Sequence, residues 1–201
     1  LALIEAEHDN LRGAVEWARD SGEDELLLRL VAVLGAFWLR RGHYRDADSW
    51  FPLALERGSS PTQARMEVLR AASIRTAGTK DYERSDAYVA EWRRLAELTG
   101  DEGEVLRAMN SAALNASEQG DLERARAELA KIGERAREIG DDRMVAFTTI
   151  NLGTVAWEGG DFPATHEYAE QAVELFRELG DLGGVATSLA TCGWSSLALE
   201  D

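Results

Sequence analysis

A turn signature returns every 40 residues along this chain, and its period constrains the fold more than any single residue does. Its copies are Lys80-Asp81-Tyr82, Gly120-Asp121-Leu122 and Gly160-Asp161-Phe162, with an earlier copy, Gly42-His43-Tyr44, 38 residues before the first. A Gly-Asp pair keeps the same spacing at residues 100–101, 140–141 and 180–181. Two turns per period, with helix-forming sequence between them, predict a stack of helical hairpins.

The composition favours an all-helical protein, because strong helix formers (Ala, Leu, Glu and Arg) are abundant and the chain has only three prolines. No run approaches the roughly 18 apolar residues of a membrane-spanning helix, and no signal peptide is visible. The net charge of −15 disfavours direct binding to nucleic acid or to an anionic membrane. The single cysteine, Cys192, cannot form a disulfide within the chain, so a reducing cytoplasm is expected.

Small residues recur at two fixed places around each turn, and they predict where paired helices approach closely. Those that lie seven residues before a turn are Gly35, Ser73, Ala113, Gly153 and Gly193. Those that lie five residues after a turn are Ala47, Ser85, Ala125 and Thr165. This spacing resembles the tetratricopeptide repeat, whose usual unit is about 34 residues. The longer unit here predicts helices of about 16–18 residues.

The predicted fold class is all-α, a right-handed α-α superhelix (a tetratricopeptide-like solenoid) of about four 40-residue hairpins with flanking helices. We expect one domain over residues 1–201, with a leading helix at 1–20, repeats at 23–59, 60–100, 101–140 and 141–180, and a half repeat at 181–201. The helices are expected at 2–20, 24–41, 44–57, 61–78, 82–99, 102–119, 122–139, 142–159, 162–179 and 182–199. Aspartates that follow the turn glycines are expected to be N-caps. The half repeat predicts that the chain is a fragment of a larger protein.

Residues 5–18 (EAEHDNLRGAVEWA) resemble the segment that opens the helical-repeat region of bacterial signal-transduction ATPases of the STAND class, including LuxR-type and SARP-type transcriptional regulators. Residues 37–44 and 174–181 are similar to hairpin segments of that family. The resemblance implies a non-catalytic sensor module that contacts an ATPase domain of its parent, where ATP would bind. The P-loop motif of that ATPase and a basic helix-turn-helix are absent from this sequence.

The first helix of each hairpin lines the concave groove in tetratricopeptide stacks, and the resemblance therefore places a binding surface there. The predicted groove residues are Arg70, Asn110, Leu114, Ser117, Ile150, Asn151, Thr154, Trp157 and Trp194. The asparagines could hydrogen-bond a peptide backbone, and the tryptophans could anchor apolar side chains. In the alternative interpretation, the asparagines are exposed or bond neighbouring helices, and the tryptophans pack between repeats. The expected ligand is a protein, a peptide or a small effector.

Some of the remaining conspicuous residues have structural explanations. Trp17, Trp38 and Trp50 share helical spacing with leucines, so we expect them in the core. Cys192 aligns with apolar residues of earlier repeats and is interpreted as a packing residue.

The histidines give no sign of a metal site, because His8, His43 and His166 lack the spacing of metal ligands. No catalytic, cofactor-binding or metal-binding residue is predicted. An enzyme is disfavoured, because an active site normally interrupts a repeat pattern.

Two further alternatives concern partners. The chain could be a free-standing adaptor or scaffold that binds partner peptides instead of part of a regulator. The last helix, at 182–199, presents an apolar face with Leu189, Cys192 and Leu197, which is a candidate contact for a homodimer.

Overall fold

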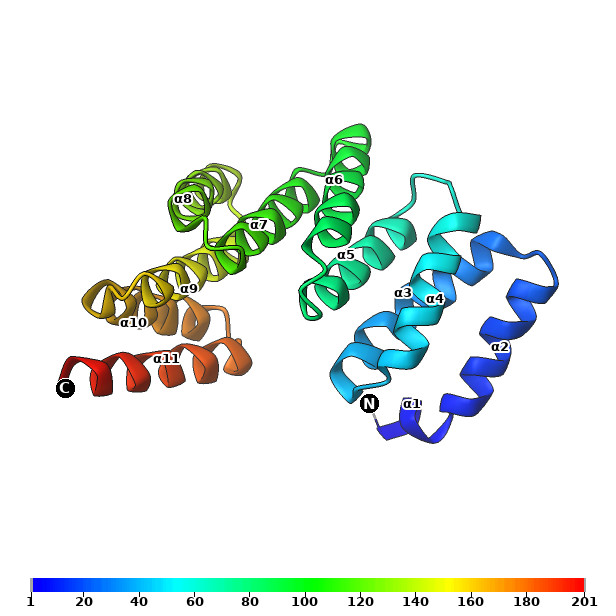
Figure 1. Cartoon of the computed structure of the whole chain (residues 1–201), viewed down its shortest axis with the longest axis horizontal. Coiled ribbons are helices and arrows are strands. Elements are labelled where there is room, and N and C mark those ends of the chain that lie inside the picture. Colours follow the sequence, from blue (N-terminus) through cyan, green and yellow to red (C-terminus); the bar gives the residue numbers. More distant parts are fainter. Residues whose placement is uncertain (1, 201) are drawn as a thin grey trace. The chain divides into compact units, whose positions relative to one another are not determined.

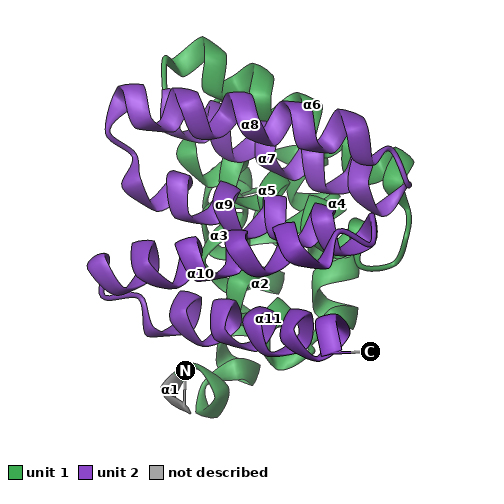
Figure 2. Ribbon diagram, turned by 90° about the vertical axis from the view of Figure 1, so that its left-hand side faces the viewer, with its two compact units in different colours: residues 1–101 green, residues 102–201 purple. Residues whose placement is uncertain are grey.

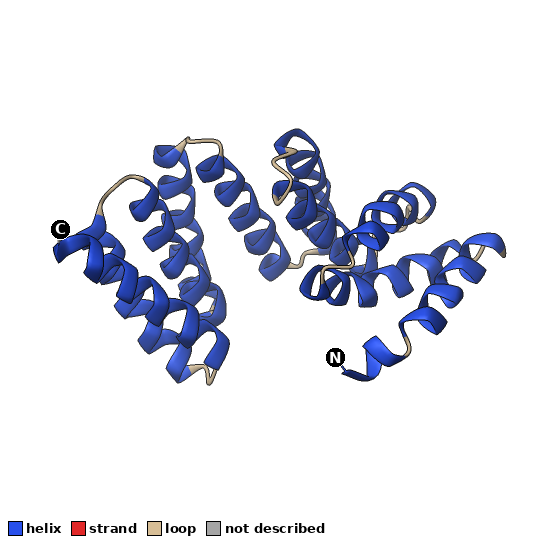
Figure 3. Ribbon diagram, turned by 60° about the horizontal axis from the view of Figure 1, so that its bottom comes forward, coloured by secondary structure: helices blue, strands red, loops and turns tan. Residues whose placement is uncertain are grey.

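The computed structural model describes residues 2–200, and all regular structure within this range is helical (Figure 3). The helices are α1 (Ala2–Ala6), α2 (His8–Asp20), α3 (Asp24–Arg41), α4 (Tyr44–Arg57), α5 (Gln63–Ala77), α6 (Tyr82–Thr99), α7 (Glu102–Glu118), α8 (Leu122–Ile139), α9 (Asp142–Glu158), α10 (Phe162–Glu178) and α11 (Leu182–Glu200). None of these helices has the length and apolar character needed to cross a membrane.

The chain divides into two compact units, residues 1–101 and residues 102–201 (Figure 2). In the first unit, α3 packs on α4 and α5, and α5 packs on α6 (Figure 1). In the second unit each helix from α7 to α11 packs on the next, and α7 also packs on α9. The all-α, tetratricopeptide-like fold class is therefore confirmed. The grouping of all the repeats into one domain stays a prediction.

The expected hairpin helices agree with the observed ones to within two residues at each end. The leading helix differs, because Glu7 has φ −99° and ψ 7° and separates α1 from α2. The start of α5 lies two residues later than expected, because Thr62 is its N-cap and accepts a hydrogen bond from the backbone N–H of Arg65.

The turns follow one design, and it explains the Gly-Asp signature. Gly120 and Gly160 adopt positive φ, as do the glycines at positions 42, 100, 140 and 180, whereas Lys80 takes the same conformation without being glycine. The aspartate that follows caps the next helix by accepting a hydrogen bond from the backbone N–H three residues later. This cap is made by Asp81, Asp121, Asp141, Asp161 and Asp181. Each cap contributes about 1 kcal/mol.

The small residues seven positions before a turn mark close contacts between paired helices in the two hairpins that have Gly35 or Gly153 at this position. A Cβ on Gly153 would lie 3.2 Å from Cβ of Tyr168, and one on Gly35 would lie 3.1 Å from Cε1 of Phe51. Gly193 has no atom within 4 Å of its would-be Cβ, and the helix expected to pair with it is not part of this sequence, so the expectation stays a prediction there. A different close approach occurs at Gly184 in α11, where a Cβ would lie 2.3 Å from the ring of Phe176 in α10.

Two of the three tryptophans that were expected in the core are buried, and one is exposed. Trp38 and Trp50 are buried, as expected. Trp17 was expected in the core but is 58% exposed. The buried residues of α2 are Val15 and Ala18, and Trp17 follows Val15 by two residues and so points away from the buried side of the helix.

Candidate functional site

Polar side chains join α7 to α9 in the second unit. Nδ2 of Asn151 donates a hydrogen bond to Oδ1 of Asn110 over 2.9 Å. About two helical turns farther along both helices, the hydroxyl of Ser117 donates to the carboxylate of Glu158. Both pairs are 41 residues apart, one more than the repeat. The repeat itself therefore aligns Asn110 with Ile150, and not with the residue that it bonds.

The two asparagines are half-buried, and their bond uses only part of what they can offer. It takes one N–H of Asn151 and one lone pair of the Asn110 carbonyl. By the chemistry of an amide, the two N–H groups of Asn110 and the carbonyl oxygen of Asn151 do not take part in it. The structure thus bears out the alternative in which the asparagines bond neighbouring helices, and it still leaves a donor and an acceptor side by side.

Other predicted groove residues of α7 and α9 differ in accessibility. Thr154 is exposed and Leu114 is half-buried, whereas Ser117 and Ile150 are only 4% and 8% exposed. The Thr154 hydroxyl donates to the Ile150 carbonyl over 3.3 Å. Surface for a ligand therefore remains at Thr154 and Leu114, and not at the two buried positions.

The tryptophans of the second unit are open to solvent to different degrees. Trp157 is 39% exposed, and its ring lies 5.1 Å from the ring of Phe162 at the start of α10. Trp194 in α11 is 61% exposed. Trp157 therefore packs partly on the neighbouring helix, while most of Trp194 is free to contact another molecule.

Sequence reasoning missed Phe147, which precedes Asn151 by one helical turn on α9. Its ring is 38% exposed, lies 5.3 Å from that of Phe176, and has the Arg143 guanidinium 5.7 Å from its centre. Its spacing from Asn151 was the signal that could have found it. We call Asn110, Leu114, Phe147, Asn151 and Thr154 the α7–α9 surface.

Arg70 belongs to α5 in the first unit, apart from the other predicted residues in sequence. Its Nη2 lies 2.5 Å from Oε2 of Glu67, three residues earlier on the same helix. The charge of Arg70 is therefore balanced locally.

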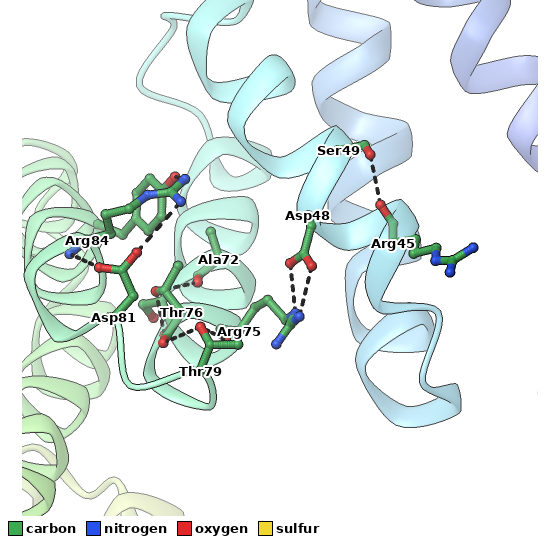
Figure 4. Close-up of polar contacts among 11 residues, drawn as sticks. Arg45, Asp48, Ser49, Ala72, Arg75, Thr76, Thr79, Asp81 and Arg84 are labelled. Carbon is green, nitrogen blue, oxygen red and sulfur yellow. Dashed lines mark hydrogen bonds and ion pairs between the residues drawn. The ribbon is translucent and has the colours of Figure 1, made fainter.

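The first unit also has a small hollow of about 200 Å³ among α4, α5 and α6. Its lining combines apolar residues, among them Phe51, Pro52 and Ala72, with charged residues. Figure 4 shows the polar contacts that the charged residues Asp48, Arg75, Asp81 and Arg84 make. Sequence reasoning did not find this hollow, because its residues come from three helices and share no motif.

The charges on the rim of this hollow are paired. Nε and Nη2 of Arg75 lie 2.8 Å from the two carboxylate oxygens of Asp48, and the guanidinium lies 4.7 Å from the centre of the Tyr44 ring. Arg84 contacts Asp81 at 3.7 Å. A charged ligand would have to displace these partners, so the hollow is a weaker candidate than the α7–α9 surface.

A third arrangement, in α10 and α11, superficially resembles a Ser-His-Glu triad. Nδ1 of His166 lies 3.1 Å from Oγ of Ser195, and Nε2 lies 3.5 Å from Oε1 of Glu170. Ser195 is fully buried, and its hydroxyl donates to the carbonyl of Cys192. Because Ser195 lies inside α11, neighbouring backbone N–H groups serve the helix and cannot form an oxyanion hole. The geometry therefore does not support acyl transfer.

Comparison with known proteins shows which families and structures the chain is similar to. Residues 104–178 match the family model of the tetratricopeptide repeat, which spans α7 to α10. A stretch of 56 residues is 41% identical to proteins named as HTH-type transcriptional regulators in Mycobacterium bovis and Mycobacterium tuberculosis. That stretch is 28% of this chain and only 6% of the length of those regulators.

Solved structures share the fold at low sequence identity. RapI in its apo form aligns over 98% of this chain and 57% of its own, with a TM-score of 0.71 and 16% identity. A Rap protein complexed with Competence and Sporulation Factor aligns over 93% of this chain and 59% of its own, with a TM-score of 0.67 and 14% identity. BtubC (BKLC) from P. vanneervenii aligns over 98% and 92%, with a TM-score of 0.64 and 15% identity. These likenesses establish a helical-repeat fold of the tetratricopeptide type.

Proposed function

We propose that this chain is a protein- or peptide-binding sensor module of a bacterial transcriptional regulator, and that the partner binds at the α7–α9 surface. The observation that carries the proposal is the Asn110–Asn151 pair, which sets an amide donor beside an amide acceptor on two adjacent helices. An extended peptide offers the complementary groups, a backbone carbonyl and an N–H, at every residue.

The surroundings of the asparagine pair suit a peptide with apolar side chains. The exposed part of the Phe147 ring lies one turn from Asn151 on the same helix, and Leu114 lies one turn from Asn110. A few buried anchors, often aromatic, carry most of the binding energy at protein interfaces, and backbone hydrogen bonds add affinity for an extended peptide. The Rap structure solved with Competence and Sporulation Factor supports binding by this fold class.

The regulatory role rests on the similarity to named HTH-type regulators and on the resemblance of residues 5–18 to STAND-class proteins. In this proposal the parent carries an ATPase domain and a DNA-binding domain outside this chain, and partner binding changes the contacts with the ATPase domain in the cytoplasm. The net charge of −15 fits a module that does not itself contact DNA. The alternative is a free-standing adaptor. If the full-length protein that contains this chain had no P-loop domain, the adaptor would be the correct alternative.

Peptide binding can be tested without a known partner. A random peptide library is displayed, selected on the 201-residue chain, and the enriched peptides are measured by calorimetry against wild type and variants. Asn151→Ala should weaken binding at least tenfold, because a peptide would lose a hydrogen bond in a partly desolvated site. Phe147→Ala should weaken it by a similar factor. Arg126→Ala, on an exposed part of α8, is the matched control and should leave binding unchanged.

The proposal fails if enriched peptides bind Asn151→Ala and Phe147→Ala as tightly as wild type. It also fails if Arg126→Ala weakens binding as much as they do. Circular dichroism melts of every variant separate lost contacts from lost structure.

A further inference from the structure

Two histidines and a carboxylate meet at the N-terminal end of the first unit. His8 opens α2, His43 is the N-cap of α4, and Asp46 lies in the first turn of α4. One ring nitrogen of each histidine and one carboxylate oxygen of Asp46 all lie within 4.8 Å of one another. The separation of His8 from the other two along the chain hid this set from sequence reasoning, which looked for ligands at motif spacing.

The distances are near those of a metal site. Nε2 of His8 lies 3.6 Å from Oδ2 of Asp46. Two ligand atoms of a tetrahedral zinc ion, with bonds of about 2.0–2.2 Å, are roughly 3.3–3.6 Å apart. The His8 and His43 rings lie next to each other and are tilted, with centroids 4.2 Å apart and planes inclined by 32°. The side chains are 15%, 26% and 19% exposed for His8, His43 and Asp46, so small rotations can bring the atoms together and an ion can enter.

The neighbours hold both imidazoles in a form that can bind a metal. Oε1 of Glu5 lies 3.2 Å from Nε2 of His43, and a carboxylate in this position orients the ring and leaves the other nitrogen as a ligand. Nε1 of Trp38 donates to Nε2 of His8 over 3.3 Å, which requires a lone pair on that nitrogen. An ion at this nitrogen has to displace a long and therefore weak hydrogen bond.

Two features oppose a cation here, and the acidic groups offset them. Arg41 approaches Glu5 with its Nε 3.4 Å from Oε2. The N-terminus of α4 carries a partial positive charge. The carboxylates of Asp46 and Glu5 supply two negative charges against these, so the site is not electropositive overall.

We propose that His8, His43 and Asp46 bind a divalent transition-metal ion, with Glu5 as the positioning residue for His43. Two imidazoles and a carboxylate suit zinc, and an open fourth position would be filled by water. The backbone of α2 packs mainly on α3, and its contacts with α4 come from side chains such as Arg57, which donates to the Arg19 carbonyl. An ion held jointly by α2 and α4 would therefore strengthen the attachment of the leading helix to the first hairpin. This inference does not depend on the proposed function.

The test is a calorimetric titration of the untagged, chelator-treated 201-residue chain with zinc chloride. A polyhistidine tag must be absent, because it binds zinc itself. We expect one ion per chain and a higher melting temperature with zinc. His8→Gln, His43→Gln and Asp46→Asn should each weaken binding at least tenfold and abolish the gain in melting temperature. His166→Gln removes the remaining histidine, which lies in the second unit, and should change neither result.

Cobalt(II) gives a second readout that loss of structure alone would not mimic. The wild-type chain should develop the visible absorption of tetrahedral cobalt, and Glu5→Gln should keep that spectrum while it weakens affinity by about 10–100-fold. The proposal is overturned if the wild-type chain binds no zinc. It is also overturned if the three ligand variants, folded by circular dichroism, bind zinc as tightly as His166→Gln does.

Discussion

Asn151 donates a 2.9 Å hydrogen bond to the side chain of Asn110, and this bond joins the first helices of two successive hairpins. Both amides are half-buried, so the bond should contribute about 0.5–1.5 kcal/mol to stability. We predict that Asn110→Ala and Asn151→Ala each lower the free energy of unfolding by an amount in this range. In a double-mutant cycle, the loss of stability in the double variant should be smaller than the sum of the two single losses by about 0.5–1 kcal/mol. Strict additivity in urea denaturation would show that the bond does not couple the two helices.

The second prediction concerns Lys80, which has φ 61° where the other turns carry glycine. A side chain in this left-handed conformation costs about 1–2 kcal/mol relative to glycine. Glycine is also more flexible in the unfolded chain, which offsets part of the gain. Lys80→Gly should therefore stabilise the chain by about 0.5–1 kcal/mol, measured as a higher melting temperature.

Gly160→Lys is the matched control, since Gly160 has φ 76° in the equivalent turn two repeats later. This substitution should destabilise by about 1 kcal/mol. Lower stability of Lys80→Gly, or higher stability of Gly160→Lys, would contradict the explanation of the turn signature.

Two glycines of α11 should respond in opposite directions to alanine. A Cβ at Gly184 would lie 2.3 Å from the ring of Phe176, which is only 1% exposed. Gly184→Ala should destabilise by about 1–3 kcal/mol, because the ring or the helix must shift. Gly193 has open space around it, so Gly193→Ala should stabilise by up to about 1 kcal/mol through helix propensity. Thermal melts of both variants check this, and equal shifts in one direction would refute the assignment of the close contact to Gly184.

The thiol of Cys192 provides a test with a pH dependence. Burial and, secondarily, the negative charge of Glu170 raise its pKa above the ordinary value of a thiol. Cys192 lines an open hollow of about 530 Å³ between α10 and α11, so an alkylating reagent can reach it. Because the thiolate is the reactive form, alkylation in the folded chain should need a higher pH than in the chain unfolded by urea.

Glu170→Gln removes the charge and should lower the pKa of Cys192, so alkylation at a given pH becomes faster. Alkylation of the folded chain at the same pH as the unfolded chain would show that the surroundings of Cys192 leave its acidity unchanged. His166→Gln is a control for loss of the contact between His166 and Glu170.

The fold followed from the sequence because the turn residues report backbone conformation directly. A glycine at positive φ and an aspartate at the N-cap are local requirements, so Gly120 and Asp121 locate one turn whatever packs around it. The break at Glu7 and the exposure of Trp17 were not predictable in this way, because both depend on which neighbours α2 has.

The candidate site was predicted only in part, for a similar reason. Asn151 and Thr154 were placed on the correct helix, since helical spacing determines a shared face. The bond between Asn110 and Asn151 depends on the offset between α7 and α9, and the repeat alignment places these residues one position out of register. The convergence of His8 with His43 depends on how α2 packs against the first hairpin, which no local pattern encodes.

Site-specific photo-crosslinking in the cells that make this protein tests directly whether a protein or peptide partner binds the α7–α9 surface. A photoreactive amino acid replaces the exposed Thr154, or Arg126 on α8 as control. Binding at this surface should give a discrete covalent adduct with a protein or peptide from position 154 and none from position 126, and the adduct should be lost when Asn151→Ala is added. Adducts that form equally from both positions, or that persist with Asn151→Ala, would contradict it.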